Sequence, residues 1–187
     1  MALIYAGITY ETREISLRNK PLSMLALSPK GTVPVLYCEG GRVIDESLNI
    51  MLWALSQLDS HDWFLPTNLQ EILTVIQKND QEFKPLLDRY KYPERYVDSQ
   101  GAFEKAIKHH IRPLHDRLLK SRYLLGANLS LADIAIFPFV RQFARVNVTL
   151  FEGLSCVRVN EWLNEIMSME IYLKAMHKYP VWEEESI

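Results

Sequence analysis

Two kinds of apolar spacing run along the chain, and each predicts a different kind of structure. Residues 33–37 are branched and aromatic, as in a strand, and residues 39–42 contain a Gly-Gly pair that favours a turn. Residues 43–44 are again apolar, so a returning strand is expected there. A helical pattern begins directly afterwards at Ser47. These residues predict a β-hairpin that leads into a helix.

A polar, turn-forming segment at residues 59–68 precedes a long region of helical spacing. Each apolar stripe in that region is expected to form the buried face of an amphipathic helix. We expect a break at residues 90–95 and later helices over residues 159–167 and 171–177. The two main stripes consist of Ile72, Ile76, Phe83, Leu86, Leu87 and Tyr90, and of Phe103, Ile107, Ile111, Leu114 and Leu118.

Ser130 and Asp133 have the spacing of a helix-capping pair. Asp133 follows three residues after the serine and can return a bond to its backbone N–H, while Leu129 and Ile134 occupy the positions of a hydrophobic staple. The role of this pair is structural, and the cap is expected to contribute roughly 0.5–2 kcal/mol to stability. Pro138 lies inside the helix that follows, where a proline kinks the helix or leaves a carbonyl group unpaired.

Pro34 lies just inside the first strand of the hairpin, where it cannot donate a hydrogen bond to a neighbouring strand. If the Val33–Pro34 peptide bond is cis, the backbone N–H and C=O groups of Val33 turn outward and can pair with an extended peptide. Glu46 and Ser47 stand at a helix N-terminus, where free N–H groups and the helix dipole favour a carboxylate. The alternative interpretation is a trans proline at a strand edge and an acidic helix cap.

The composition narrows the possible functions. A chain of 187 residues with 48% hydrophobic content can bury a core and form one or two domains. A formal net charge of −2 gives no signature of nucleic-acid binding. No apolar run reaches the roughly 18 residues that span a bilayer, and the apolar N-terminus has no basic leader, so we expect a cytoplasmic protein without a membrane partner.

No disulfide, catalytic or metal-binding role is predicted for the cysteines and histidines. Cys38 and Cys156 are far apart in the sequence, and a disulfide between them is not expected in a reducing compartment. Cys38 has no adjacent histidine or helix N-terminus to activate its thiol, so we expect no nucleophile there. His109, His110 and His115 lack the i, i+4 spacing of two ligands on one helix face, and no metal is expected.

Four segments of the chain stand in a familiar order: Leu17-Arg-Asn-Lys20-Pro21, Leu27-Ser-Pro29-Lys-Gly31-Thr-Val33-Pro34-Val-Leu, Asp45-Glu46-Ser47 and Gly126-Ala-Asn-Leu-Ser130-Leu-Ala-Asp133-Ile-Ala. Together they resemble the glutathione transferase superfamily, and most of all its omega-type, cysteine-using branch. The resemblance implies an α+β protein of two domains. Residues 1–58 would form a thioredoxin-like, glutathione-binding domain, and residues 67–187 would form an all-helical domain.

The resemblance also implies roles for particular residues. Val33, held by Pro34, would pair through its backbone with the cysteinyl part of glutathione. Glu46 and Ser47 would receive the γ-glutamyl end, and Lys20 would approach the glycyl carboxylate. In relatives the nucleophile lies between the first strand and the first helix. Residues 1–7 resemble the back half of that helix, so the nucleophile is expected upstream of Met1 and no catalytic residue is expected in this chain.

The expected first strand would lie between residues 10–17, taken as the second strand, and residues 33–37. Without it, a weakened first domain is expected unless a partner chain or a repaired register supplies the pairing. In its complete form the protein would conjugate glutathione or carry out thiol transfer, as a homodimer, on a small hydrophobic electrophile or a disulfide. The alternative is a non-catalytic glutathione transferase fold used for protein interaction. Candidate contacts to the second substrate are Tyr90, Tyr92, Phe137 and Arg141.

Overall fold

The computed structural model describes residues 1–57, 63 and 69–183. It divides into two compact units, one formed by Met1–Ser60 with Glu170–Ile187 and the other by His61–Met169. The predicted domains differ from these units at the C-terminal end, where the last helix packs with the first unit. Of the predicted linker at residues 59–68, all but Trp63 lies outside the described residues.

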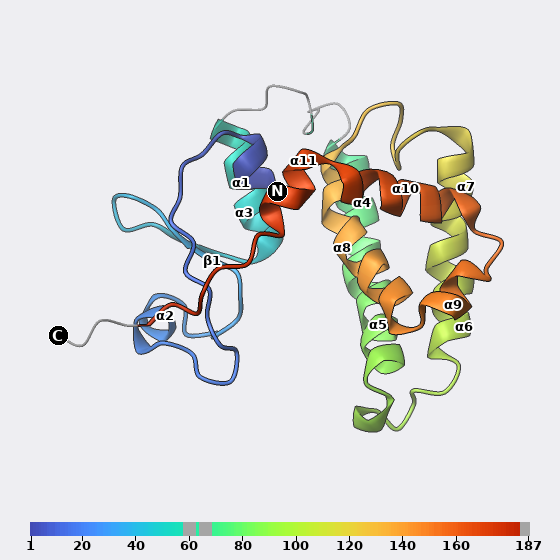
Figure 1. Ribbon diagram of the computed structural model, residues 1–187, viewed down its shortest axis with the longest axis horizontal. Coiled ribbons are helices and arrows are strands. Elements are labelled where there is room, and N and C mark those ends of the chain that lie inside the picture. The colour runs from blue at the N-terminus through green and yellow to red at the C-terminus, as the bar shows by residue number, and fades with distance from the viewer. Residues whose placement is uncertain (58–62, 64–68, 184–187) are drawn as a thin grey trace. The chain divides into compact units, whose positions relative to one another are not determined.

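The first unit is held together by a pair of helices and a hairpin (Figure 1). Ala2 on the first helix and Ala6 directly after it are buried against Ala54 on α3, and their small side chains allow the two helices to approach closely. The predicted hairpin is present, and its strands pair antiparallel with Leu36 opposite Ile44. The elements are α1 (Ala2–Tyr5), α2 (Leu22–Leu27), β1 (Val35–Tyr37), β2 (Val43–Asp45), α3 (Ser47–Gln57) and α11 (Glu170–Ala175).

Residues 10–17 do not form the expected strand, and this prediction is wrong for the described structure. The segment takes part only in isolated bridges, one of them a turn between Ser16 and Asn19. The other joins Glu14 in parallel to Val181, near the C-terminal end of the chain. A strand needs a neighbour along its whole length to satisfy its backbone groups. Here the neighbour is a short piece of chain that the local sequence of residues 10–17 does not reveal.

The second unit is a bundle of helices, as the apolar stripes predict. Two of its long helices each contain a π-helical turn, and a proline follows soon after each turn. The predicted break at residues 90–95 contains a short 3₁₀ helix. The elements are α4 (Leu69–Lys78), η2 (Asn79–Phe83), α5 (Lys84–Lys91), η3 (Pro93–Arg95), α6 (Ala102–Ala106), η4 (Ile107–Ile111), α7 (Arg112–Lys120), α8 (Leu131–Val146), α9 (Val148–Glu152) and α10 (Val157–Ser168).

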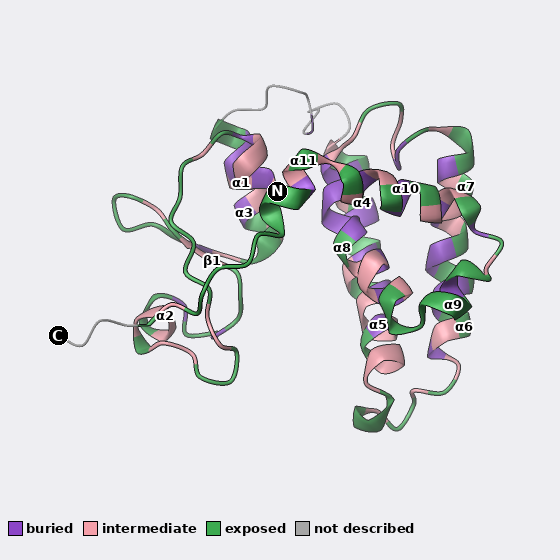
Figure 2. Ribbon diagram, viewed as in Figure 1, coloured by how far each residue is buried: buried purple, intermediate pink, exposed green. Residues whose placement is uncertain are grey.

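Helix α8 forms the centre of this bundle, and its first half is buried almost all round (Figure 2). The helix runs on through Pro138 to Val146. At its N-terminus, Ser130 and Asp133 form a capping box. The Asp133 carboxylate also accepts hydrogen bonds from the Leu124 backbone N–H and the Trp162 indole N–H, each at 2.9 Å. The buried carboxylate therefore ties α8 to the loop before it and to α10.

Aromatic side chains fill the space between the helices. Phe143 contacts Phe83 on one side, and Phe103 stacks on it with ring centroids 5.5 Å apart. His110 stacks on Phe83 at 4.0 Å and is 5% exposed. Burial, with Lys78 as a smaller cause, lowers the pKa of His110 to about 3, so the imidazole is neutral in the folded protein. Within the described residues, no helix is long and apolar enough to cross a membrane.

Candidate functional site

The start of the hairpin leaves one backbone segment open to solvent. The Val33–Pro34 peptide bond is cis, which is the configuration that the peptide-site hypothesis requires. β1 begins at Val35 and so leaves Val33 outside the ladder, with a residue exposure of 49%. Among the described residues, no backbone hydrogen bond engages Val33. Its N–H and C=O groups are therefore available to an extended ligand.

Helix α3 presents its N-terminus beside this segment. Ser47 is its first residue, and the first bond of the helix runs from the Ile50 N–H to the Glu46 carbonyl oxygen at 3.1 Å. The N–H groups of the first turn have no partner within the helix and carry the positive end of its dipole. Glu46 and Ser47 are both exposed. A carboxylate is the group that such a helix end favours.

Glu46 has an unusual backbone conformation for a residue with a side chain. Its φ angle is +68°, and it is the one non-glycine residue with positive φ in the described part of the chain. The left-handed conformation costs an L-residue roughly 1–2 kcal/mol. Strained residues of this kind persist where the surrounding structure holds them, and they are frequent at functional sites.

The hairpin register brings these two features together. Val35 lies opposite Asp45, the last residue of β2, and such opposed residues have Cα atoms about 4.5–5.5 Å apart. Val33 and Ser47 each lie two residues beyond this pair, at the same end of the hairpin. An extended tripeptide spans roughly 10 Å and can reach across a separation of this kind. The structure thus gathers Val33, Pro34, Glu46 and Ser47 at one end of the hairpin.

Lys20 lies on the approach to this region. Its Nζ atom is 3.7 Å from the position that a Cβ atom would take on Gly31. Gly31 itself is buried and has a φ angle of +61°, which a glycine adopts without strain. The absence of a side chain at Gly31 lets the Lys20 chain lie close to the backbone that leads to Val33.

Lys30 is a site residue that the sequence reasoning missed. Its ammonium group lies 3.1 Å from an Asp45 carboxylate oxygen and 3.3 Å from a Glu46 carboxylate oxygen. Hydrogen bonds to Asp45 and then to Glu46 raise the pKa of Lys30. The side chain thereby joins the loop before the cis proline to the N-terminus of α3. The one available signal in the sequence is the position of Lys30 next to Gly31, within the motif that contains the cis proline.

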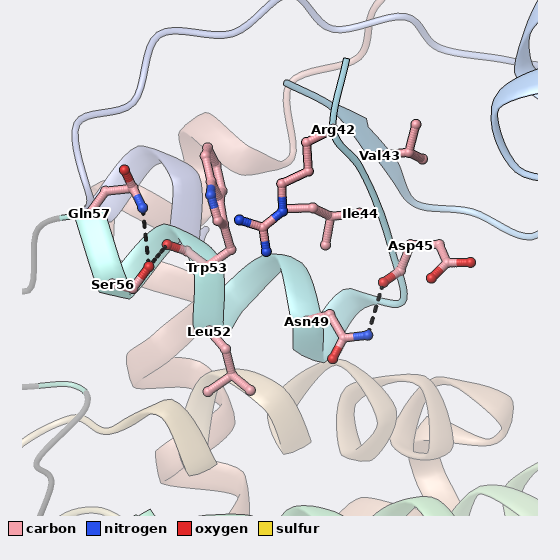
Figure 3. Close-up of a pocket in the computed structure, with 9 residues that line it drawn as sticks. All are labelled: Arg42, Val43, Ile44, Asp45, Asn49, Leu52, Trp53, Ser56 and Gln57. Atoms are coloured by element: carbon pink, nitrogen blue, oxygen red, sulfur yellow. Dashed lines mark hydrogen bonds between the residues drawn. The ribbon is translucent and has the colours of Figure 1, made fainter. Parts of the chain in front are cut away.

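A shallow pocket of about 470 Å³ is lined by residues of β2 and α3 (Figure 3). Of the residues gathered around the end of the hairpin, Asp45 alone lines it, and none of the five predicted glutathione contacts does. Arg42 projects over α3, and the Asn49 side chain donates to the Asp45 carbonyl oxygen at 3.2 Å. The lining residues are Arg42, Val43, Ile44, Asp45, Asn49, Leu52, Trp53, Ser56 and Gln57.

The structure corrects one expected contact to a second substrate. Phe137 is 2% exposed and packs edge-on against Trp162 inside the helical unit, so it belongs to the core and cannot line a surface site. Tyr90 packs on Phe103 and Phe143. The two cysteines are free thiols, and Cys38 follows β1 at the opposite end of the strand from Val33.

Comparison with known proteins identifies the family. The sequence model of the glutathione S-transferase N-terminal domain matches residues 1–57, and that of the C-terminal domain matches residues 84–183. Glutathione S-transferase omega-1 of Sus scrofa is 28% identical over 178 residues, which cover 93% of this chain and 68% of the relative. Elongation factor 1-gamma 2 of Oryza sativa is 24% identical over 191 residues, covering 96% of this chain and 43% of the relative.

The fold agrees with this relationship. The crystal structure of glutathione transferase F2 from Populus trichocarpa superposes with a TM-score of 0.77 at 21% identity, covering 94% of this chain and 89% of that one. The chain belongs to the glutathione S-transferase family, and its sequence resembles the omega-type branch.

Proposed function

We propose that this protein binds glutathione at the end of the hairpin and uses it as a co-substrate. The observation that carries the proposal is the open backbone of Val33 next to the free N–H groups of α3. Val33 and Pro34 would hold the cysteinyl part, and Glu46 with Ser47 would receive the γ-glutamyl end. Lys20 would approach the glycyl carboxylate.

The charges of the region support this orientation of the ligand. Glutathione carries an ammonium group and a carboxylate at its γ-glutamyl end and a second carboxylate at its glycyl end. The Glu46 carboxylate suits the ammonium group, the N-terminus of α3 suits the first carboxylate, and the Lys20 ammonium suits the second. Lys30 holds the Glu46 carboxylate near the helix end before any ligand arrives.

The proposed reaction is glutathione conjugation or thiol transfer. In conjugation, the glutathione sulfur forms a bond to an electrophilic carbon and a leaving group departs. In thiol transfer, a thiolate attacks one sulfur of a disulfide and the other sulfur leaves as a thiolate. No catalytic side chain is assigned within residues 1–187, and no metal is proposed. A small hydrophobic electrophile or a disulfide would be the second substrate.

The proposal further includes two domains at residues 1–58 and 67–187, a homodimer and a cytoplasmic location. The family relationship supports each of these as an expectation. The alternative of a non-catalytic interaction module is not favoured, because the curated omega-type relatives are named transferases.

Isothermal titration calorimetry with reduced glutathione tests the binding site. Glu46→Gln removes the proposed ion pair with the ligand, and we expect the Kd to rise about tenfold, since one lost charge-assisted hydrogen bond costs roughly 1.5 kcal/mol. Glu39→Gln is the matched control, because Glu39 is an exposed glutamate in the hairpin turn at the opposite end of the strands. An unchanged Kd for Glu46→Gln, or no heat of binding for the unmodified protein, would refute the site.

A further inference from the structure

The C-terminal tail (residues 176–183) lies against the segment that leads to Lys20. It leaves α11, which packs on α1 within the same unit, and then crosses beside residues 10–14 (Figure 1). The Trp182 N–H donates to the Glu14 carbonyl oxygen at 2.7 Å, the shortest backbone hydrogen bond among those outside helices and strands in the described residues. Val181 forms the parallel bridge to Glu14.

Side chains support the same register along the tail. The Arg13 guanidinium lies 4.7 Å from the centre of the Trp182 ring, within the range of a cation–π contact. Arg13 is held in place by two hydrogen bonds to Glu11, at 2.9 and 3.0 Å. Burial, and next the neighbouring Tyr179, raise the pKa of Tyr10, so these two tyrosines also lie close together. The contacts therefore advance along both segments in the same direction.

The segment that the tail contacts leads to Lys20, which is a proposed ligand contact. Beyond Glu14 the chain closes a turn in which the Asn19 N–H donates to the Ser16 carbonyl oxygen at 3.1 Å, and Lys20 follows directly. Apart from that turn and the tail, residues 12–19 have no ladder partner in the described structure. In the described structure, the tail is thus the backbone partner that this segment has outside its own turn.

We propose that the C-terminal tail is a strap that fastens residues 13–19 and thereby positions Lys20 for the glycyl carboxylate of glutathione. Lys20 is the group that touches the ligand, and Trp182 and Val181 are positioning residues. The inference deepens the proposed function and rests on it for its glutathione part. The strap is shallow, because Val181 remains 58% exposed, and a contact of this kind opens readily without unfolding the unit.

The first measurement is hydrogen–deuterium exchange on the full chain, without ligand. Trp182→Pro removes the donor to Glu14, and we expect faster exchange in peptides that cover residues 10–19. Lys178→Ala is the matched control, because Lys178 is exposed in the same tail and has no hydrogen bond or ion pair in the described structure. Equal exchange in Trp182→Pro and the unmodified chain would overturn the strap.

The second measurement is the Kd for reduced glutathione. We expect Trp182→Pro, and a chain that ends at Lys178, to bind about fivefold more weakly or worse, a typical size for coupling between two sites. A synthetic peptide of residues 179–187 added to the shortened chain should restore both the Kd and the slow exchange. Altered exchange with an unchanged Kd would overturn the link to Lys20.

The two measurements separate this inference from the proposed function. If the unmodified chain does not bind glutathione, the proposed function fails and the role of Lys20 fails with it, while the exchange experiment still decides whether the strap exists. If slow exchange of residues 10–19 is seen only when two chains associate, the tail pairs with a second copy and the strap within one chain is refuted. Sedimentation of Trp182→Pro and the unmodified protein at matched concentration distinguishes that outcome.

Discussion

Replacing Asp133 by alanine should destabilise the helical unit far more than replacing an exposed carboxylate. The Asp133 carboxylate is fully buried and accepts four hydrogen bonds. Two come from Ser130, through its N–H at 3.0 Å and its hydroxyl at 2.6 Å. The other two come from the Leu124 backbone and the Trp162 indole. Burial raises the pKa of Asp133, and the hydrogen bonds act against that shift.

The expected loss follows from the donors that alanine would leave without a partner. The Leu124 and Trp162 donors are buried, and each unsatisfied buried donor costs about 1–3 kcal/mol. Loss of the cap at Ser130 adds roughly 1 kcal/mol. The sum is about 3–7 kcal/mol, which is a large part of the roughly 5–15 kcal/mol that stabilises a domain. We expect Asp133→Ala to be partly unfolded at growth temperature.

Urea unfolding followed by far-ultraviolet circular dichroism measures this loss. Trp162→Phe removes one donor and leaves the carboxylate with three, so it should cost less than Asp133→Ala. Asp116→Ala is the matched control, because Asp116 is an exposed aspartate on α7, and a surface change of this kind stays within about 0.5 kcal/mol. A loss below about 1 kcal/mol for Asp133→Ala would refute the claim that this carboxylate joins α8, α10 and the loop before α8.

Three further predictions concern other parts of the chain. His110 has a pKa of about 3 in the folded protein and an ordinary value of 6.5, so the unfolded state binds more protons between these pH values and stability falls as the pH falls. The free energy of unfolding should therefore drop by about 2 kcal/mol between pH 6.5 and 5. Urea unfolding at both pH values measures this drop, and His110→Phe should lack the part that His110 causes. Glu46→Gly should relieve the left-handed strain and raise the melting temperature while it weakens glutathione binding. A lower melting temperature in scanning calorimetry, or an unchanged Kd in titration calorimetry, would contradict the role given to Glu46. Iodoacetamide should label the half-buried Cys38 before Cys156 in the folded protein, since Cys156 is 4% exposed and burial raises its pKa. Mass spectrometry of the digested protein measures the order of labelling, and earlier labelling of Cys156 would contradict the prediction.

The elements that were predicted correctly from the sequence are those whose stabilising contacts are local. The hairpin follows from the Gly-Gly turn between two apolar runs, and its strands lie at Val35–Tyr37 and Val43–Asp45. The long helices follow from their apolar stripes. The first strand begins later than residue 33 because Pro34 has no N–H to donate to β2. In these cases the residues that determine the structure are close together in the sequence.

The elements that were missed depend on contacts between distant residues. The partner of Glu14 is Val181, and no pattern within residues 10–17 indicates it. Lys30 reaches Asp45 and Glu46 only because the hairpin folds them together. The π-helical turns at Asn79–Phe83 and Ile107–Ile111 were missed for another reason: the apolar residues around them keep the i+3 and i+4 spacing that an uninterrupted α-helix also has.

The proposed ligand site lies on the unit with the smaller apolar core. That unit depends on close-packed alanines on α1 and α3, whereas the helical unit buries large aromatic side chains such as Phe83 and Trp162. A ligand that binds only the folded form adds RT ln(1 + [L]/Kd) to its stability, about 2.7 kcal/mol at a hundredfold excess over the Kd. This amount matters most where the core contributes least. Ordering of residues 10–20 by the C-terminal tail and ordering by glutathione therefore act on the same weak part of the fold, and each should strengthen the other.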